Sequence, residues 1–156
     1  METEKNMSWN MVSEIELIYR SKVKPSKRPE IKTARAAYEL LLSHWDDNTI
    51  ELTETAIALL MNKANRVMGM YRMSTGGITG TVVDPRLLFA AALKVNASAF
   101  ILAHNHPSGN LLPSQQDKAI TEKLMSAGKF LDIKLLDHLI ISTENYYSFS
   151  DEGLLY

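Results

Sequence analysis

The chain has 156 residues, which is enough for one domain with a hydrophobic core. Hydrophobic residues make up 46% of it and charged residues 22%, as in globular rather than disordered proteins. The net charge of −1 argues against nucleic-acid binding through bulk charge, and the lack of cysteine excludes disulfides and thiolate zinc sites.

No targeting or membrane segment is expected. Residues Met1–Asn10 are polar and lack the apolar stretch of a secretory signal. The longest apolar runs, Ile57–Met61 and Ser98–Ala103, are far too short to cross a bilayer. We therefore expect a soluble, cytoplasmic protein.

The N-terminal region divides into two stretches. Residues Val12–Tyr19 alternate in polarity, which predicts a half-buried strand near a sheet edge. Residues Arg20–Arg35 carry seven basic side chains against one acid, and Pro25 and Pro29 disfavour a helix there. The charge allows weak contact with nucleic acid, but a solvated linker or arm is the simpler interpretation.

The rest of the chain predicts helices alternating with strands. In chain order we expect a helix at Thr33–Trp45, a strand at Thr53–Met61, a turn at Asn62–Asn65, strands at Val67–Met73 and Ile78–Val83, a helix at Asp84–Val95, a strand at Ser98–Ala103, a helix at Ser114–Ala127, and strands at Leu131–Ser142 and Tyr146–Phe149. The continuous apolar run Ser98–Ala103 is typical of a strand covered on both faces. This order predicts an α/β fold, or α+β sandwich, with helices around a central sheet.

The most informative residues follow that buried strand. His104 and His106 stand one residue apart, so on an extended backbone both point to the same face and can hold one cation. Asp117 follows eleven residues later and completes a three-ligand set. Three protein ligands leave one tetrahedral position open, as in catalytic zinc sites. A metal held in this way can activate water near neutral pH.

The segment between these ligands has a second explanation. Pro107 restricts the backbone and Gly109 permits a sharp turn, after which Ser114 stands at the start of the next helix. Asp117 then occupies the third helical position, where a serine and an acid form a capping box that needs no metal. Capping alone, however, does not account for the spacing to the two histidines.

The other candidate residues are less distinctive. A hydrolase needs a carboxylate to accept a proton from water, and Glu51 and Glu54 precede the first apolar strand. His44 is expected at a helix end rather than as a ligand. His138 lies in an apolar strand, either as a buried core residue or, paired with Asp137, as hydrogen-bonding support for the metal ligands.

The assembled motif resembles a known signature. The pattern His-x-His-Pro, six residues, then Ser-x-x-Asp, with a distant Glu, resembles that of JAMM (MPN+) metalloproteases. The form His-Asn-His-Pro-Ser-Gly, then Pro-Ser-x-x-Asp and later Leu-Asp-His-Leu-Ile, more narrowly resembles the RadC family. We divide the chain into an N-terminal strand and basic arm at 1–30 and a JAMM/MPN-like RadC domain at 31–156. The resemblance implies a mixed central β-sheet flanked by helices, similar to the cytidine-deaminase-like fold.

The resemblance also implies roles for individual residues. His104, His106 and Asp117 would be the ligands of a Zn²⁺ ion. Glu54 would be the general base, since it has the family's distance from the strand end Leu-Leu-Met-Asn. Ser114 would hydrogen-bond the water or the developing oxyanion.

This chain departs from the family pattern in two places. Ala56 stands where family members often have an aromatic residue, two positions after the catalytic Glu. Longer RadC proteins also carry an N-terminal helix-hairpin-helix region associated with DNA backbone contact, and residues 1–30 show no such pattern. The chain therefore resembles the short, single-domain forms.

We predict a zinc-dependent metallohydrolase that cleaves a peptide or isopeptide amide bond. The alternative is a protein of DNA repair or recombination with a structural or vestigial metal site, supported by the basic residues Arg20–Arg35. Metal-dependent nuclease activity is a third possibility. The loops at 75–79 and 110–112 would select the substrate, which the sequence does not identify.

Overall fold

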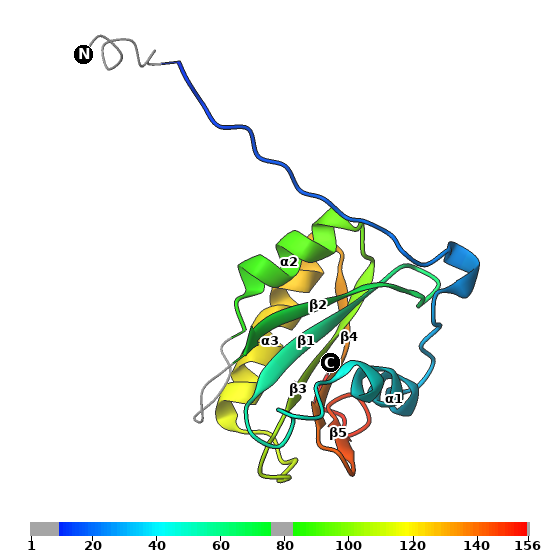
Figure 1. Ribbon diagram of the computed structural model, residues 1–156. Coiled ribbons are helices and arrows are strands. Elements are labelled where there is room, and N and C mark those ends of the chain that lie inside the picture. The colour runs from blue at the N-terminus through cyan, green and yellow to red at the C-terminus, as the bar shows by residue number, and fades with distance from the viewer. Residues whose placement is uncertain (1–9, 76–82, 156) are drawn as a thin grey trace.

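The computed structural model describes residues 10–75 and 83–155 (Figure 1). Within them the elements are a 3-10 turn at Pro25–Lys27, α1 (Ala34–His44), β1 (Thr55–Met61), β2 (Val67–Thr75), α2 (Pro85–Lys94), β3 (Ala99–Asn105), α3 (Gln115–Leu131), β4 (Lys134–Ile141) and β5 (Tyr146–Ser148). The predicted strand at 78–83 falls almost entirely outside the described residues.

The strands form one mixed sheet in the order β2-β1-β3-β4-β5. Strands β3 and β4 are parallel, and the other neighbours are antiparallel. Every residue of β1 and β3 is buried, as expected of central strands covered on both faces. The predicted α/β architecture, a mixed central sheet flanked by helices as in the JAB/MPN fold, is confirmed.

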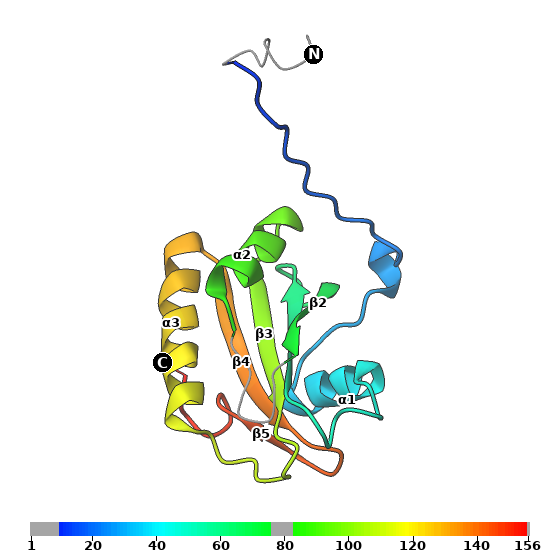
Figure 2. The same ribbon diagram turned by 60° about the vertical axis from the view of Figure 1, so that its left-hand side comes forward.

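Helices cover the two faces of the sheet separately (Figure 2). On one face, Ala37, Tyr38 and Leu41 of α1 pack against side chains such as Ile101 and Leu139. On the other face, α2 and α3 pack against a second apolar cluster, which includes Phe100 and Leu102 of β3 and Leu124 of α3. Alternate residues of β3 therefore belong to different cores, and the polar residues at its end must also point to opposite faces.

The first two helices begin where the sequence predicts them, and each start is capped by a side chain. The Thr33 side chain accepts a hydrogen bond from the Ala36 amide at the start of α1, and Asp84 caps α2 ahead of Pro85. The end of α3 was predicted too early, because the helix continues to Leu131.

The end of α3 depends on a close backbone contact. A Cβ atom at Gly128 would lie 2.2 Å from the Ile133 carbonyl oxygen, so only glycine allows the chain to turn back this tightly. Asp132 then ends the helix in the left-handed conformation. As a result β4 begins at Lys134 rather than at Leu131.

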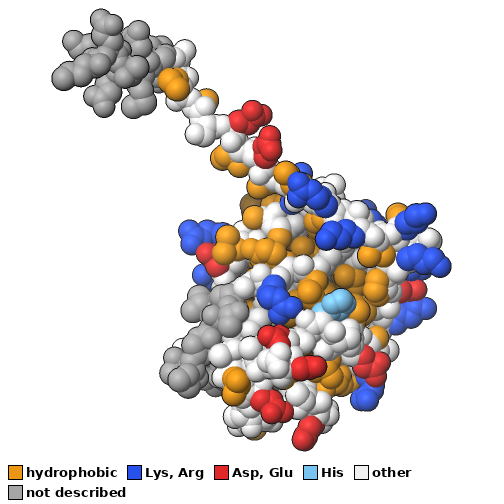
Figure 3. Space-filling model, in the orientation of Figure 1, with side chains coloured by type: hydrophobic (Ala, Val, Ile, Leu, Met, Phe, Trp, Pro, Cys, Tyr) orange, Lys and Arg blue, Asp and Glu red, His pale blue; other side chains and the backbone are white. Residues whose placement is uncertain are grey.

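The prediction of a half-buried strand at Val12–Tyr19 is wrong. This segment forms no strand, and Val12 and Ile15 are exposed. It runs away from the domain as an arm whose apolar side chains are visible in Figure 3. Alternating polarity does not by itself bury a segment. Among the described residues, the arm meets the sheet near β2, where the Tyr19 hydroxyl donates to the Met68 carbonyl oxygen.

The basic residues that follow form a connection, as predicted, with one 3-10 turn at Pro25–Lys27. Residues Pro29 to Ile31 run beside the start of β2 through a bridge between Glu30 and Arg66. On the face shown in Figure 3, the Lys and Arg side chains are scattered rather than merged into one patch. Among the described residues, no helix is long and apolar enough to cross a membrane.

Candidate metal centre

The two histidines stand where β3 ends, on the sheet face covered by α2 and α3. His104 lies in the strand, and His106 follows with its amide bonded to the Ile141 carbonyl oxygen of β4. This bond keeps the backbone extended through both residues. Their Nε2 atoms lie 3.0 Å apart, so the predicted convergence of the rings is confirmed.

Asp117 reaches the same point from the first turn of α3. One carboxylate oxygen lies 3.2 Å from Nε2 of His104 and the other 3.4 Å from Nε2 of His106. The three residues each present one ligand atom within 4.8 Å of the others. Their side chains are 7%, 14% and 16% exposed, so solvent reaches the outer side of the cluster.

The predicted capping box coexists with this cluster. The Ser114 hydroxyl oxygen accepts from the Asp117 amide at 3.0 Å, and the Ser114 amide donates to Oδ2 of Asp117 at 2.8 Å. The box fixes the carboxylate against the helix end while leaving lone pairs directed at the histidines. Capping and metal binding are therefore not exclusive explanations of this segment.

A short loop sets the orientation of His106. Nδ1 of this residue lies 2.5 Å from the Asn110 carbonyl oxygen. Because a carbonyl only accepts, Nδ1 carries a hydrogen and, in the neutral ring, Nε2 keeps its lone pair for the cluster. The loop closes through Gly109, whose φ of 82° suits glycine and whose amide donates to the His106 carbonyl oxygen.

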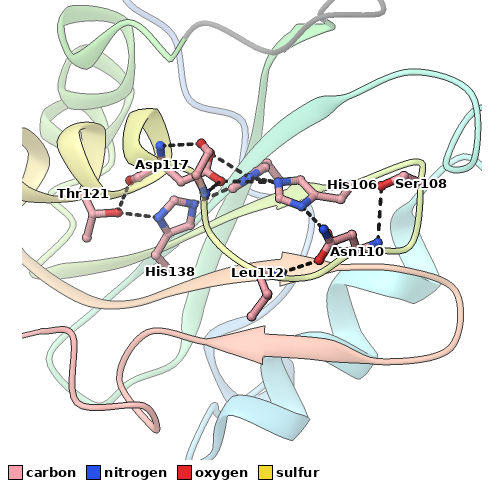
Figure 4. Close-up of polar contacts among 9 residues, drawn as sticks. His106, Ser108, Asn110, Leu112, Asp117, Thr121 and His138 are labelled. Carbon is pink, nitrogen blue, oxygen red and sulfur yellow. Dashed lines mark hydrogen bonds and ion pairs between the residues drawn. The ribbon is translucent and has the colours of Figure 1, made fainter.

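Buried side chains set the orientation of His104. Its Nδ1 lies 2.8 Å from Nε2 of His138, whose Nδ1 in turn lies 2.6 Å from Oγ1 of Thr121. Figure 4 shows His138 and Thr121 on one side of Asp117, with His106 and its loop on the other. His138 therefore contacts a candidate ligand directly, as the supporting role considered from the sequence requires.

Asp137 does not take part in that support. Its carboxylate points to the opposite face, where it accepts hydrogen bonds from Ser148, Ser150 and the His138 amide. Thr121 occupies the place that the sequence interpretation gave to Asp137. Thr121 lies only four residues after Asp117, but its contact with His138 depends on how α3 packs against β4, which the sequence does not show.

The electrostatics of the cluster favour a bound cation. Burial raises the pKa of Asp117, but the neighbouring His104 and His106 rings outweigh burial and hold that pKa far below its usual range. Burial lowers the pKa of His106, yet its bonds to Asp117 and Asn110 raise it overall. Burial together with the neighbouring His104 places the pKa of His138 well below its usual value. A positive charge is therefore stabilised beside Asp117.

Glu54 lies immediately before β1, across from the ligands. Ala56 pairs with His104 in the antiparallel register, and Glu54 stands two residues before Ala56, beyond the last pair of the two strands. Its charge is also among those that raise the pKa of His106. Glu51, by contrast, is exposed and accepts a hydrogen bond from Thr143.

The sequence interpretation missed Asn105, between the two histidines. It is fully buried, and its Oδ1 accepts from the Thr55 amide at 2.7 Å. Its Nδ2 donates to the carbonyl oxygens of Ile50 at 2.6 Å and Thr53 at 2.8 Å. Asn105 therefore ties the segment that carries Glu54 to the strand that carries the ligands. Strand alternation predicts that the Asn105 side chain points to the sheet face opposite that of His104. Its hydrogen-bond partners on that face are known only from the fold.

His44 stays apart from this centre. It is the last residue of α1, as predicted, and it does not belong to the cluster formed by the described ligand residues.

Comparisons with known proteins agree with the motif. The family model described as RadC-like JAB domain matches residues 31–154. The chain belongs to this family. The match includes all of β1 to β5 and every residue of the candidate metal centre.

The chain is also similar to curated proteins named UPF0758. A UPF0758 protein of Flavobacterium johnsoniae is 54% identical over 96 residues, which cover 62% of this chain and 42% of that protein. UPF0758 protein STH371 of Symbiobacterium thermophilum is 38% identical over 136 residues, covering 87% and 57%. UPF0758 protein YfjY of Escherichia coli K12 is 37% identical over 142 residues, covering 80% and 89%. The chain thus spans about half the length of the first two relatives.

Proposed function

We propose that this RadC-like JAB domain is a zinc-dependent hydrolase that cleaves a peptide or isopeptide amide bond. The observation that carries the proposal is the convergence of His104, His106 and Asp117. Metal-assisted hydrolysis also requires a carboxylate that accepts a proton from water, and we assign this role to Glu54, two residues before the Ala56 that pairs with His104.

The donor set fits a zinc ion. Two imidazole nitrogens and one carboxylate are ligands that Zn²⁺ prefers, and three of them leave a position open for a water or substrate. Both imidazoles have Nδ1 engaged elsewhere, so two ring nitrogens and a carboxylate face one another. Three such electron-rich groups repel unless a cation or proton lies between them. When bound, zinc would polarise the substrate carbonyl and make water more acidic.

The remaining chemistry belongs to two residues of the chain. Glu54 accepts a proton from the attacking water and then donates it to the leaving amine nitrogen. The Ser114 hydroxyl accepts from the Asp117 amide, so its own hydrogen remains available. It donates a hydrogen bond to the oxyanion that forms as the carbonyl is attacked. The proton transfer through Glu54 and this hydrogen bond account for the water proton and the developing negative charge.

The proposal is tested by separating metal binding from turnover. The purified protein should hold about one zinc ion per chain by elemental analysis. Activity is measured on labelled peptides and on lysine-linked isopeptides. Glu54→Gln should retain the metal and lose turnover, while the exposed Glu51→Gln serves as the matched control and should keep both. A protein that takes up no zinc, or a Glu54→Gln variant with full activity, contradicts the proposal.

A further inference from the structure

We propose that Thr121 and His138 act as positioning residues, forming a hydrogen-bond relay that holds His104 in the tautomer needed for metal binding. This inference rests on the proposed function, because it assigns His104 as a metal ligand. It adds two buried residues, behind the three candidate ligands, to the site.

The relay is continuous from the candidate ligand to the backbone of α3. Nδ1 of His104 lies 2.8 Å from Nε2 of His138. Nδ1 of His138 lies 2.6 Å from Oγ1 of Thr121, and that hydroxyl donates to the Asp117 carbonyl oxygen at 2.7 Å. Thr121 and His138 are 2% and 1% exposed, so water does not compete for these bonds.

Only one order of donors along this relay leaves a metal-binding nitrogen on His104. A neutral imidazole has one N–H and one lone pair, so Nε2 of His104 is free only if Nδ1 carries the hydrogen. Nε2 of His138 must then accept, and its Nδ1 must donate to Thr121. The Thr121 hydroxyl keeps its own hydrogen for the Asp117 carbonyl, which only accepts. The relay therefore ends on a carbonyl oxygen, which can only accept, and this favours one direction for every hydrogen bond in it.

The surrounding packing holds the relay in place. The His138 ring stacks on Phe149 with a centroid distance of 4.6 Å and an interplanar angle of 18°. Thr121 stands one helical turn after Asp117 on α3. The same helix thus supplies one candidate ligand and the acceptor that orients another. A shift of α3 would change both together.

The first test reads the tautomers directly in the metal-free protein, by ¹⁵N–¹H correlation of the histidine rings. His104 should be the Nδ1–H tautomer in the wild type and in Thr121→Ser, which keeps the hydroxyl. Thr121→Val removes the acceptor for His138, so both rings should shift toward the reversed tautomers. Ser148→Ala is the matched control, because it removes a buried hydroxyl that binds Asp137 on the other face.

The second test measures Co²⁺ and Zn²⁺ affinity by competition with a chelator. Loss of an outer hydrogen-bond partner weakens metal binding about tenfold to a hundredfold, so Thr121→Val should lose that much and Thr121→Ser should stay within about threefold of the wild type. Unchanged tautomers and unchanged affinity in a folded Thr121→Val overturn the relay. A wild type that binds neither metal contradicts the proposed function, while the tautomers of the metal-free protein still decide the relay.

Discussion

The two faces of the central sheet use buried polar residues differently, although the residues are neighbours in sequence. His104 and His138 point toward α3, and the adjacent Asn105 and Asp137 point to the other face. On the α3 side, nitrogen and oxygen atoms converge around one point. On the other side, Asn105 makes three hydrogen bonds to the segment at 50–55, and Asp137 makes two to the segment at 148–150 and one to the His138 amide.

The face toward α3 carries the candidate metal ligands, whereas the buried polar residues of the other face hold neighbouring chain segments in place, and we call that second face the scaffold. Asn105 holds the segment at 50–55, and Asp137 holds the turn at 148–150, with their polar atoms paired within the protein. In the cluster of His104, His106 and Asp117, one atom of each side chain instead lies close to the other two, so the three residues could hold a metal ion. Substitutions on the two faces should therefore affect different properties.

The largest effect is expected on the site face. His104→Ala removes one of three candidate ligands, so the zinc content measured by elemental analysis should fall from about one per chain to near zero. The matched control is His44→Ala, which removes a histidine at the end of α1, outside the cluster. A His104→Ala variant that retains its zinc would show that His104 is not one of the ligands.

The next largest effect is expected on the scaffold face. Asn105→Ala leaves the Thr55 amide and the Ile50 and Thr53 carbonyls without their buried partner. Each orphaned group costs about 1 kcal/mol or more, so the free energy of unfolding should fall by about 3 kcal/mol or more in denaturant titrations. Metal affinity should change little in the folded fraction, because β3 and α3 supply the ligands.

Asn62→Ala is the control for that experiment. Asn62 also accepts two backbone hydrogen bonds, from the amides of Ala64 and Arg66, but it lies in a partly exposed turn where water can replace them. Its loss should cost about 1 kcal/mol or less. If Asn105→Ala costs no more than Asn62→Ala, the scaffold role assigned to Asn105 is wrong.

Much of the site face was predictable from sequence, for a physical reason. An alternating strand end fixes the relative directions of His104 and His106, and a serine-to-acid capping box fixes the place of Asp117 in its helix. These are local rules, so the motif predicts the cluster without knowledge of the fold. The helix start at Asp84 was predicted on the same basis.

The remainder depends on contacts between distant segments. Thr121 meets His138 and Asn105 meets Ile50 only because the sheet order brings them together. The strand predicted at Val12–Tyr19 did not form. Its residues alternate in polarity, but the segment pairs with no strand of the described sheet. The late end of α3 follows from a backbone contact between Gly128 and Ile133.

The smallest effect concerns the comparison between Asp137, which is buried, and Asp117, which is partly exposed. Burial raises the pKa of Asp137 despite its hydrogen bonds from Ser148 and Ser150, whereas the pKa of Asp117 is held far below its usual range. A raised folded pKa means that the contribution of Asp137 to stability is complete below its unfolded pKa, about 3.9, and is lost as the pH rises through the folded value. Asp117, whose folded pKa is lowered, contributes stability above its unfolded pKa, and this contribution is lost as the pH falls.

Asp137→Asn therefore separates hydrogen bonding from charge. Asparagine keeps an oxygen for the His138 and Ser150 amides and offers its amide nitrogen to the Ser148 hydroxyl. Unfolding free energies of wild type and variant should be similar near about pH 4 and diverge in favour of the variant at higher pH. Metal affinity should not change, because the carboxylate faces away from the ligands. Greater stability of the wild type at neutral pH would mean that the charge of Asp137, and not only its hydrogen bonds, stabilises the scaffold face.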